Sequence, residues 1–80
     1  NPGCYFYVGE DRIKVGKLSI CRELELKIGE IKIINKQFLI GTNNGCINVL
    51  RCQNSNGKML DAKDFLNGYK FKEYKVNTCC

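Results

Sequence analysis

The fold signal is strongest in residues 43–52, which read Asn-Asn-Gly-Cys-Ile-Asn-Val-Leu-Arg-Cys. Asn and Gly tolerate the positive φ angles of tight turns, so residues 43–45 predict a reversal of the chain. Residues 46–52 follow as a strand with a cysteine at each end. This turn and strand indicate antiparallel β structure, and the same signals recur on both sides of them.

Toward the N-terminus, residues 4–8 are dense in aromatic and β-branched residues, which favours a strand. Residues 9–11 close that strand as a turn. Residues 12–20 alternate weakly between apolar and polar, with a bulge or bend expected at Gly16. Residues 23–34 alternate more clearly, but the phase changes at Gly29. Either Gly29 begins a tight hairpin, or it marks a bulge and the chain reverses at residues 35–37, which the apolar residues 38–40 favour slightly.

Toward the C-terminus, residues 53–58 are a polar loop. Residues 59–67 permit one short helical turn, with Asp61 as its cap, Phe65 and Leu66 facing inward and Gly68 as its stop. A long loop fits the same residues almost as well. Residues 69–76 alternate aromatic and charged residues, as a half-exposed strand does. About six short strands with little helix predict an all-β fold, a small sandwich or barrel.

Length and cysteine content bound the class of protein. Eighty residues make a single domain, residues 1–80, whose core is marginal without a covalent staple. An even number of cysteines at this density predicts a disulfide framework and a secreted protein. The chain opens on Asn1 without an apolar leader, so a mature form is expected, its signal peptide removed. Its apolar runs are far shorter than a membrane span. The six cysteines are Cys4, Cys21, Cys46, Cys52, Cys79 and Cys80.

The absence of histidine removes several chemistries. No Ser-His or Cys-His nucleophile pair and no mixed Cys/His zinc site can form. The cysteine spacings fit an all-cysteine zinc site badly, so neither a metal nor another cofactor is expected. Eight acidic residues are dispersed along the chain, and Glu23 and Glu25 alternate with leucines as on a solvated strand face. We therefore expect no enzyme and no catalytic residues.

The net charge of +5 suits an anionic partner. In the last predicted strand, Lys70, Lys72 and Lys75 alternate with aromatic residues. Such interleaving occurs in single-strand nucleic-acid platforms, but it is also what an exposed strand looks like when its lysines suppress aggregation. The solvated strand is the favoured interpretation, a protein-binding edge comes second, and nucleic acid or lipid comes last.

The order of strands and cysteines resembles a known family. One cysteine opens the first strand, Cys21 follows the second, Cys46 follows the Asn/Gly turn, and a final cysteine closes the chain. This layout is similar to the MAX effector family, the ToxB-like secreted effectors of ascomycete plant-pathogenic fungi. The resemblance implies a disulfide-stapled sandwich of two three-stranded antiparallel sheets. It further implies a Cys4–Cys46 bridge, a bridge from Cys21 to Cys79 or Cys80, and a bridge from Cys52 to the remaining terminal cysteine.

The same resemblance implies a function in virulence without catalysis. The protein would act in the host apoplast, or in the host cytoplasm after translocation. There it would bind a host plant protein, such as a heavy-metal-associated (HMA) domain or an immune receptor, through a strand edge. It would be a monomer that neither binds nucleic acid nor inserts into membranes. The candidate contacts are Lys70, Lys72 and Lys75 of the last strand and Glu10, Asp11 and Arg12 of the first hairpin.

Two other functions fit the composition. A small cationic toxin or antimicrobial protein would act on membranes or cell walls, which the charge and the cysteine density allow. The interspersed acids and the lack of a strongly amphipathic basic face argue against it. An inhibitor of a secreted enzyme would present the loop of residues 53–58, anchored at Cys52, although no cysteine lies near the other end of that loop.

Overall fold

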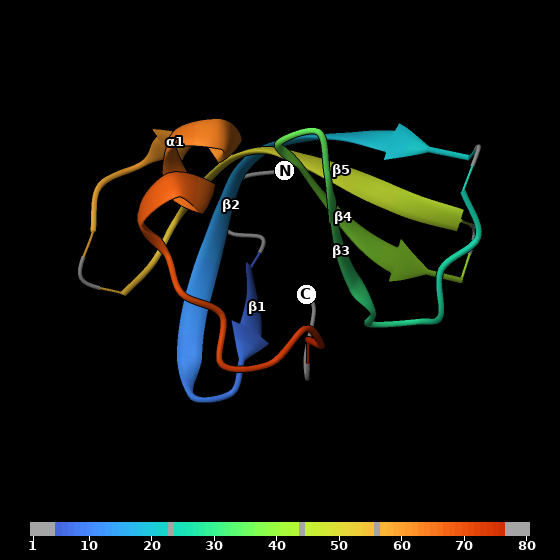
Figure 1. The fold of residues 1–80 in the computed structure, drawn as a ribbon, viewed down its shortest axis with the longest axis horizontal. Helices are drawn as coiled ribbons and strands as arrows, with labels where there is room; N and C mark the ends of the chain where they lie inside the picture. Colours follow the sequence, from blue (N-terminus) through green and yellow to red (C-terminus); the bar gives the residue numbers. More distant parts are fainter. Residues whose placement is uncertain (1–4, 23, 44, 56, 77–80) are drawn as a thin grey trace.

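The computed structural model describes residues 5–22, 24–43, 45–55 and 57–76, which form one curled antiparallel sheet with a short helix packed against it (Figure 1). The strand order is β1-β2-β5-β4-β3, and β6 pairs with β5 beside that path. The prediction of a mostly β protein is confirmed. The prediction of two separate three-stranded sheets was wrong, because all the strands among the described residues join a single sheet. The elements are β1 (Tyr5–Val8), β2 (Asp11–Cys21), β3 (Ile31–Ile34), β4 (Gln37–Thr42), β5 (Gly45–Gln53), β6 (Leu60–Asp61) and α1 (Ala62–Gly68).

The tight turns lie where Asn and Gly predict them. Thr42 pairs with Gly45, whose φ of +119° suits glycine, so β4 reverses into β5 as expected. Asn35 and Lys36 both have positive φ between β3 and β4, as in a type I′ hairpin, and confirm the reversal at residues 35–37. The predicted strand over residues 23–34 is wrong in its first half. Its described residues before Gly29 form no strand, and Gly29 (φ +83°) lies in the turn that leads into β3.

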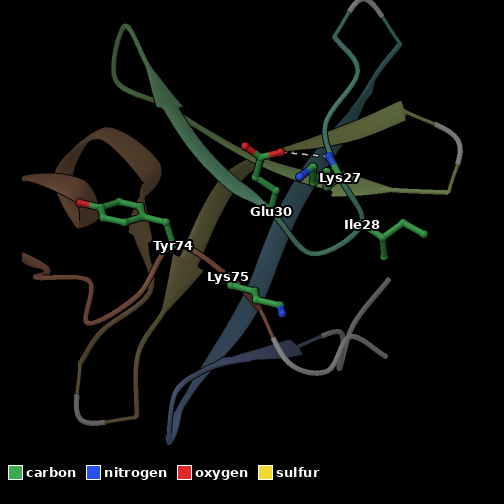
Figure 2. Close-up of a pocket in the computed structure, with 5 residues that line it drawn as sticks. All are labelled: Lys27, Ile28, Glu30, Tyr74 and Lys75. Carbon is green, nitrogen blue, oxygen red and sulfur yellow. Dashed lines mark hydrogen bonds between the residues drawn. The ribbon is translucent and has the colours of Figure 1, made fainter.

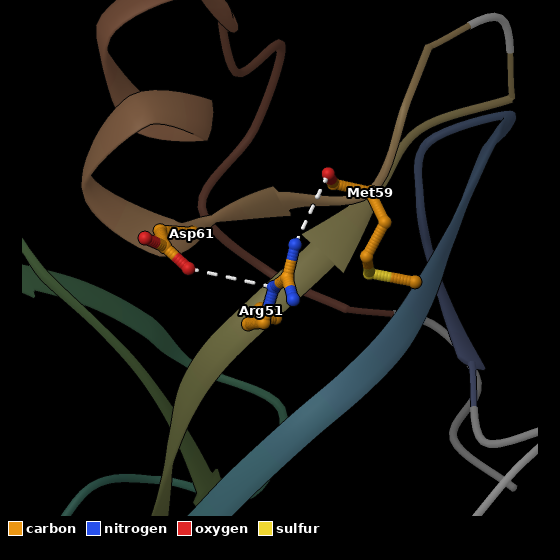
Figure 3. Close-up of polar contacts among 3 residues, drawn as sticks. All are labelled: Arg51, Met59 and Asp61. Atoms are coloured by element: carbon orange, nitrogen blue, oxygen red, sulfur yellow. Dashed lines mark hydrogen bonds and ion pairs between the residues drawn. The ribbon is translucent and has the colours of Figure 1, made fainter.

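β2 is the longest strand and carries the predicted bulge. Its pairing with β5 shifts register on both sides of Lys17, directly after Gly16. The side chain of Met59 extends toward β2 (Figure 3), and a Cβ atom on Gly16 would lie 2.6 Å from its Sδ atom. The bulge therefore combines extra local twist with a close approach that a glycine permits.

Aromatic rings fill the core on one face of the sheet. Phe38 lies at its centre, with ring centroids 5.7 Å from Phe6, 6.1 Å from Phe65 and 5.5 Å from Phe71. Edge-to-face and offset pairs of this kind contribute beyond the area that they bury. The remaining apolar side chains of this cluster, all buried, are Val8, Ile13, Val15, Ile31, Ile40, Val49, Cys52, Ala62 and Val76.

The short helix α1 confirms the helical alternative for residues 59–67. Phe65 faces the core, Leu66 packs against it, and the helix ends at Gly68 as predicted. Asp61 stands at the N-cap position without making the expected side-chain cap hydrogen bond. Its Oδ1 atom instead lies 3.4 Å from Arg51 Nε, and the Arg51 guanidinium also donates to the Met59 carbonyl at 3.5 Å (Figure 3). A cross-strand ion pair between β5 and β6 has thus taken the place of the cap.

The segment after the helix joins the two ends of the curled sheet. It was predicted as a strand, but its regular pairing is limited to a bridge between Lys75 and Glu30. Two backbone hydrogen bonds flank that bridge, from Ile31 N to Tyr74 O (3.0 Å) and from Val76 N to Gly29 O (2.8 Å). Two residues before the bridge, the Glu73 carboxylate accepts the Gly9 N–H at the β1–β2 turn. The rings of Tyr69 and Phe71 pack against the core, whereas Tyr74 is exposed, so the first part of the apolar alternation is satisfied without a strand.

A second buried region lies on the opposite face, at the β4–β5 end. Leu39 is 2% exposed and Cys46 is fully buried, yet neither belongs to the aromatic core cluster. The Lys27 backbone and the Leu26 Cβ atom lie directly over Gly41, and Gly41 exchanges hydrogen bonds with Gly29 and Glu30 at 3.0 and 2.9 Å. We call this region, Leu26, Lys27, Leu39, Gly41 and Cys46, the covered corner.

The described cysteines correct the predicted disulfides. Cys46 and Cys52 carry free thiols, so the Cys4–Cys46 bridge and a bridge from Cys52 to the terminal pair were wrong. Cys4, Cys79 and Cys80, and with them the predicted bridge to Cys21, lie outside the described residues. No helix among the described residues is long and apolar enough to cross a membrane.

Candidate functional site

Cations gather on the outer face of β1 and β2. Tyr7 pairs with Arg12 and Tyr5 pairs with Lys14, so these four side chains lie on one face, opposite the buried Phe6 and Ile13. The bulge at Gly16 then returns Lys17 to the same face, where it stands opposite Arg51. Because Arg51 is already paired with Asp61, the available cations are Arg12, Lys14 and Lys17. We call the surface made by Tyr5, Tyr7, Arg12, Lys14 and Lys17 the basic strip.

The basic strip has aromatic rings beside its charges. The Arg12 guanidinium lies 5.5 Å from the centroid of the Tyr5 ring, a cation–π contact that restricts the arginine. The rings of Tyr5 and Tyr7 meet edge to face with centroids 5.9 Å apart. All three cations are exposed, whereas both tyrosines are half-buried. The strip therefore offers positive charge, ring surface and phenolic hydroxyl groups on the framework of the sheet.

The predicted contact cluster in the first hairpin is split by the strand alternation. Arg12 belongs to the basic strip, but Asp11 pairs with Val8 and accepts a hydrogen bond from the Tyr69 hydroxyl at 2.8 Å. Burial and then this hydrogen bond raise the pKa of Tyr69 to about 12, so Tyr69 remains a donor to Asp11. Glu10 is exposed in the turn. The Asp11 carboxylate therefore serves the fold, whereas Arg12 lies on the outer face with Lys14 and Lys17.

The lysines of the C-terminal segment are exposed but do not form a platform. Lys70, Lys72 and Lys75 all lie on the irregular segment rather than on a strand. Lys75 lines a hollow of about 290 Å³ with Lys27, Ile28, Glu30 and Tyr74 (Figure 2). In that view the Tyr74 ring points away from Ile28 and Lys75, and the Glu30 carboxylate accepts the Lys27 backbone N–H at 3.0 Å. The hollow thus brings no ring face together with its ammonium groups.

Most of the basic strip was not predicted from the sequence. Lys14, Lys17, Tyr5 and Tyr7 were not singled out, although Arg12 was. The available signal was the alternation of Arg12 and Lys14 with the buried Ile13 and Val15. Lys17 breaks that alternation by one position, and only the bulge at Gly16 restores it to the strip. Among the described residues, no group of three or more acidic, cysteine or histidine side chains is placed to hold a metal ion.

Comparison with known proteins gives a consistent family. Residues 1–70 match the family described as formyl transferase, C-terminal domain. The methionyl-tRNA formyltransferase of Corynebacterium diphtheriae is 29% identical over 72 residues, which cover 90% of this chain and 23% of that enzyme. That of a Hydrogenobaculum species is 32% identical over 69 residues, covering 85% of this chain and 23% of the enzyme. The chain therefore spans about a quarter of the length of the curated relatives that it matches.

These matches overturn the functional expectations. The resemblance to MAX effectors is wrong, and with it the virulence function and the host plant protein or HMA domain as partner. The expectation that the protein is not an enzyme is also wrong, because the matched family is a domain of transferases. The exclusion of nucleic acid falls as well, since the relatives are named for a tRNA substrate. The cysteine and strand layout misled because short antiparallel strands with scattered cysteines recur in unrelated folds. Secretion stays a prediction.

Proposed function

Because the chain belongs to the formyl transferase C-terminal domain family, we propose that it is the RNA-binding part of a formyltransferase that acts on a methionyl-tRNA. In this proposal the domain holds the RNA in position and supplies no reacting group. The absence of histidine, noted above, fits a role in binding.

The basic strip is the observation that carries the proposal. Arg12, Lys14 and Lys17 lie on one face of β2, and the carboxylate of Asp61, near the end of that face, is already paired with Arg51. Each cation that meets a phosphate releases condensed counterions, so such a strip binds RNA through its backbone in a salt-dependent manner. Arginine and lysine on a rigid strand are suited to this, because phosphate contacts fix the register of the nucleic acid without reading its sequence.

The strip's tyrosines add a second kind of contact. Their half-buried rings and hydroxyl groups can meet sugars, phosphates or exposed bases, which are the groups that RNA presents in its shallow minor groove and loops. Since Arg12 is held over Tyr5, part of the entropy cost of ordering that arginine is already met before RNA binds.

The salt dependence of tRNA binding tests the proposal. We would measure the affinity of the protein for a methionine tRNA at several salt concentrations, and repeat this for Arg12→Gln, Lys14→Gln and Lys17→Gln. Log affinity falls as log salt concentration rises. Each substitution is expected to make this slope less steep by about one, because one phosphate contact is lost. Lys36→Gln is the matched control, since Lys36 is equally exposed but lies in the β3–β4 turn at the far edge of the sheet.

The control decides between a strip and a general charge effect. If Lys36→Gln lowers the slope as much as the strip variants do, binding depends on net charge alone and the strip is not the site. If the unmodified protein shows no salt-dependent affinity for tRNA, the proposed function itself is wrong.

A further inference from the structure

Two cysteines face each other across neighbouring strands. Cys21 at the end of β2 is the register partner of Cys46 near the start of β5. Residues directly opposite in an antiparallel pair have Cα atoms about 4.5 to 5.5 Å apart, and disulfides usually join Cα atoms about 4.4 to 6.8 Å apart. The register therefore places the two cysteines within the Cα separation that a disulfide usually spans.

The two thiols already interact and differ in access. They hydrogen-bond to each other, and burial, followed by this contact, raises the pKa of Cys46 to about 11. Cys46 is fully buried in the covered corner. Cys21 is half-buried and lines a groove of about 440 Å³ together with Ser19, Ile20, Arg22, Gln37, Leu39 and Asn48. A small solute can thus reach Cys21 before Cys46, and the Cys46 sulfur lies next to the Cys21 sulfur.

We propose that Cys21 and Cys46 form an oxidative modification site, at which a peroxide converts the thiol pair into a cross-strand disulfide. The Cys21 sulfur takes one oxygen atom from hydrogen peroxide, giving a sulfenic acid and one water. The Cys46 sulfur then bonds to the Cys21 sulfur and expels the oxygen as a second water, with the Cys46 proton. Two thiols and one peroxide give one disulfide and two waters, and a dithiol reductant reverses the reaction.

The bond would act as a clamp between β2, which bears the cations of the basic strip, and β5. It would lie beside the β4–β5 turn, where a Cβ atom on Gly45 would already be 3.0 Å from the Cys21 carbonyl oxygen. Because the strands are in place beforehand, the disulfide constrains mainly the unfolded chain. We therefore expect the oxidised protein to melt at a higher temperature. This inference does not depend on the proposed RNA binding.

Peptide mapping tests the site in the unaltered protein. Trypsin places Cys21 in residues 18–22, Cys46 in residues 37–51 and Cys52 in residues 52–58, so each described cysteine lies in a separate peptide. After treatment with hydrogen peroxide and alkylation in denaturant, we expect the first two peptides to be linked, and the link to disappear on reduction. Cys52 is the matched control. It is buried on the same strand, but its register partners are Val15 and Leu60, so its thiol should remain alkylatable.

Two results would overturn the proposal. One is a Cys21 that proceeds to sulfinic acid, or links to a different cysteine, while Cys46 is recovered as a thiol. The other is a Cys52 that oxidises as completely as Cys46, since this would mean that peroxide acts on unfolded chains. A Cys21→Ser variant should leave Cys46 fully alkylatable after the same treatment. If Cys46 is oxidised in that variant, Cys21 is not the entry point and the proposed order of steps fails.

Discussion

The two faces of the sheet are packed in different ways. On the core face, rings of Phe6, Phe38, Phe65 and Phe71 pack against one another through side chains alone. In the covered corner, the Lys27 backbone lies directly on Gly41, beside the Leu26 Cβ atom. Side chains can change rotamer when a neighbour changes, but a backbone held by hydrogen bonds cannot. The core should therefore respond to lost volume and the corner to added volume.

The largest expected effect is the loss of the central ring. Phe38→Ala removes contacts with three other aromatic side chains at a fully buried position. We expect the free energy of unfolding to fall by about 3 to 5 kcal/mol, through lost transfer energy and the cavity left behind. Denaturation by urea measures it. Domains of this size are marginally stable. If the unfolding free energy of the unmodified protein is near the lower end of the usual range, the variant would be largely unfolded at room temperature.

A conservative variant separates volume from the special role of the ring. Phe38→Leu retains most of the buried volume and should cost clearly less than Phe38→Ala. Equal costs for the two variants would mean that the aromatic contacts, rather than the filling of space, dominate the stability of the core. The core face would then not be sensitive to lost volume as such.

Adding one methyl group tests the covered corner. In Gly41→Ala the new Cβ atom would overlap the Lys27 carbonyl oxygen and lie 2.8 Å from the Leu26 Cβ atom, so the covering segment would have to move away. Two backbone hydrogen bonds between Gly41 and its neighbours would weaken with it. We expect a loss of about 1 to 3 kcal/mol of unfolding free energy. Gly68→Ala is the control, since its Cβ atom meets nothing within 4 Å; a similar loss there would contradict the packing argument.

The buried thiol of Cys52 gives the core face a distinct response to pH. Burial raises its pKa from 9.0 to about 12. Below pH 9 the thiol is protonated in both states, so stability is unaffected. Between pH 9 and 12 the unfolded chain ionises while the folded protein does not. The free energy of unfolding should then fall by about 1.4 kcal/mol per pH unit from this residue.

Replacing the thiol isolates this contribution. Cys52→Ala should be less stable than the unmodified protein at pH 7, yet show a shallower decline between pH 9 and 12 in urea titrations. Cys46 and Tyr69, whose pKa values are also raised, would supply the decline that remains. An unchanged alkaline slope in Cys52→Ala would show that the Cys52 thiol does not remain protonated in the folded protein.

The sequence predicts those parts of the fold that depend on local backbone chemistry. Asn35, Gly45 and Gly16 mark two hairpins and a bulge because each conformation favours these residue types. It fails where tertiary contacts decide. The alternation in residues 24–28 and 69–76 is apolar against polar as in strands, but the first segment covers Gly41 and the second spans the ends of the sheet. Both alternations express burial on one side, which an irregular segment can also achieve.

The candidate site was harder to predict than the fold. Its cations are three positions of one strand whose common face depends on a bulge, and sequence spacing alone places Lys17 on the wrong side. The cysteine count pointed to disulfides, whereas Cys46 and Cys52 are free thiols that fill buried positions as small apolar side chains do. The inference of secretion was built on the expected disulfides and then favoured a secreted family.

The smallest expected effect lies at the other close approach in the molecule. In Gly16→Ala the new Cβ atom would lie 2.6 Å from Met59 Sδ and 3.0 Å from its Cε atom, so the obstacle is a flexible side chain rather than a backbone. Methionine has three rotatable bonds and can move aside, so we expect a loss below about 1 kcal/mol. In the double variant with Met59→Ala the cost of Gly16→Ala should vanish, which a double-mutant cycle in urea measures. If Gly16→Ala costs as much as Gly41→Ala, the difference between a side-chain neighbour and a backbone neighbour does not determine the cost of the added methyl group. Backbone strain at the bulge would then be the larger contribution to the cost of Gly16→Ala.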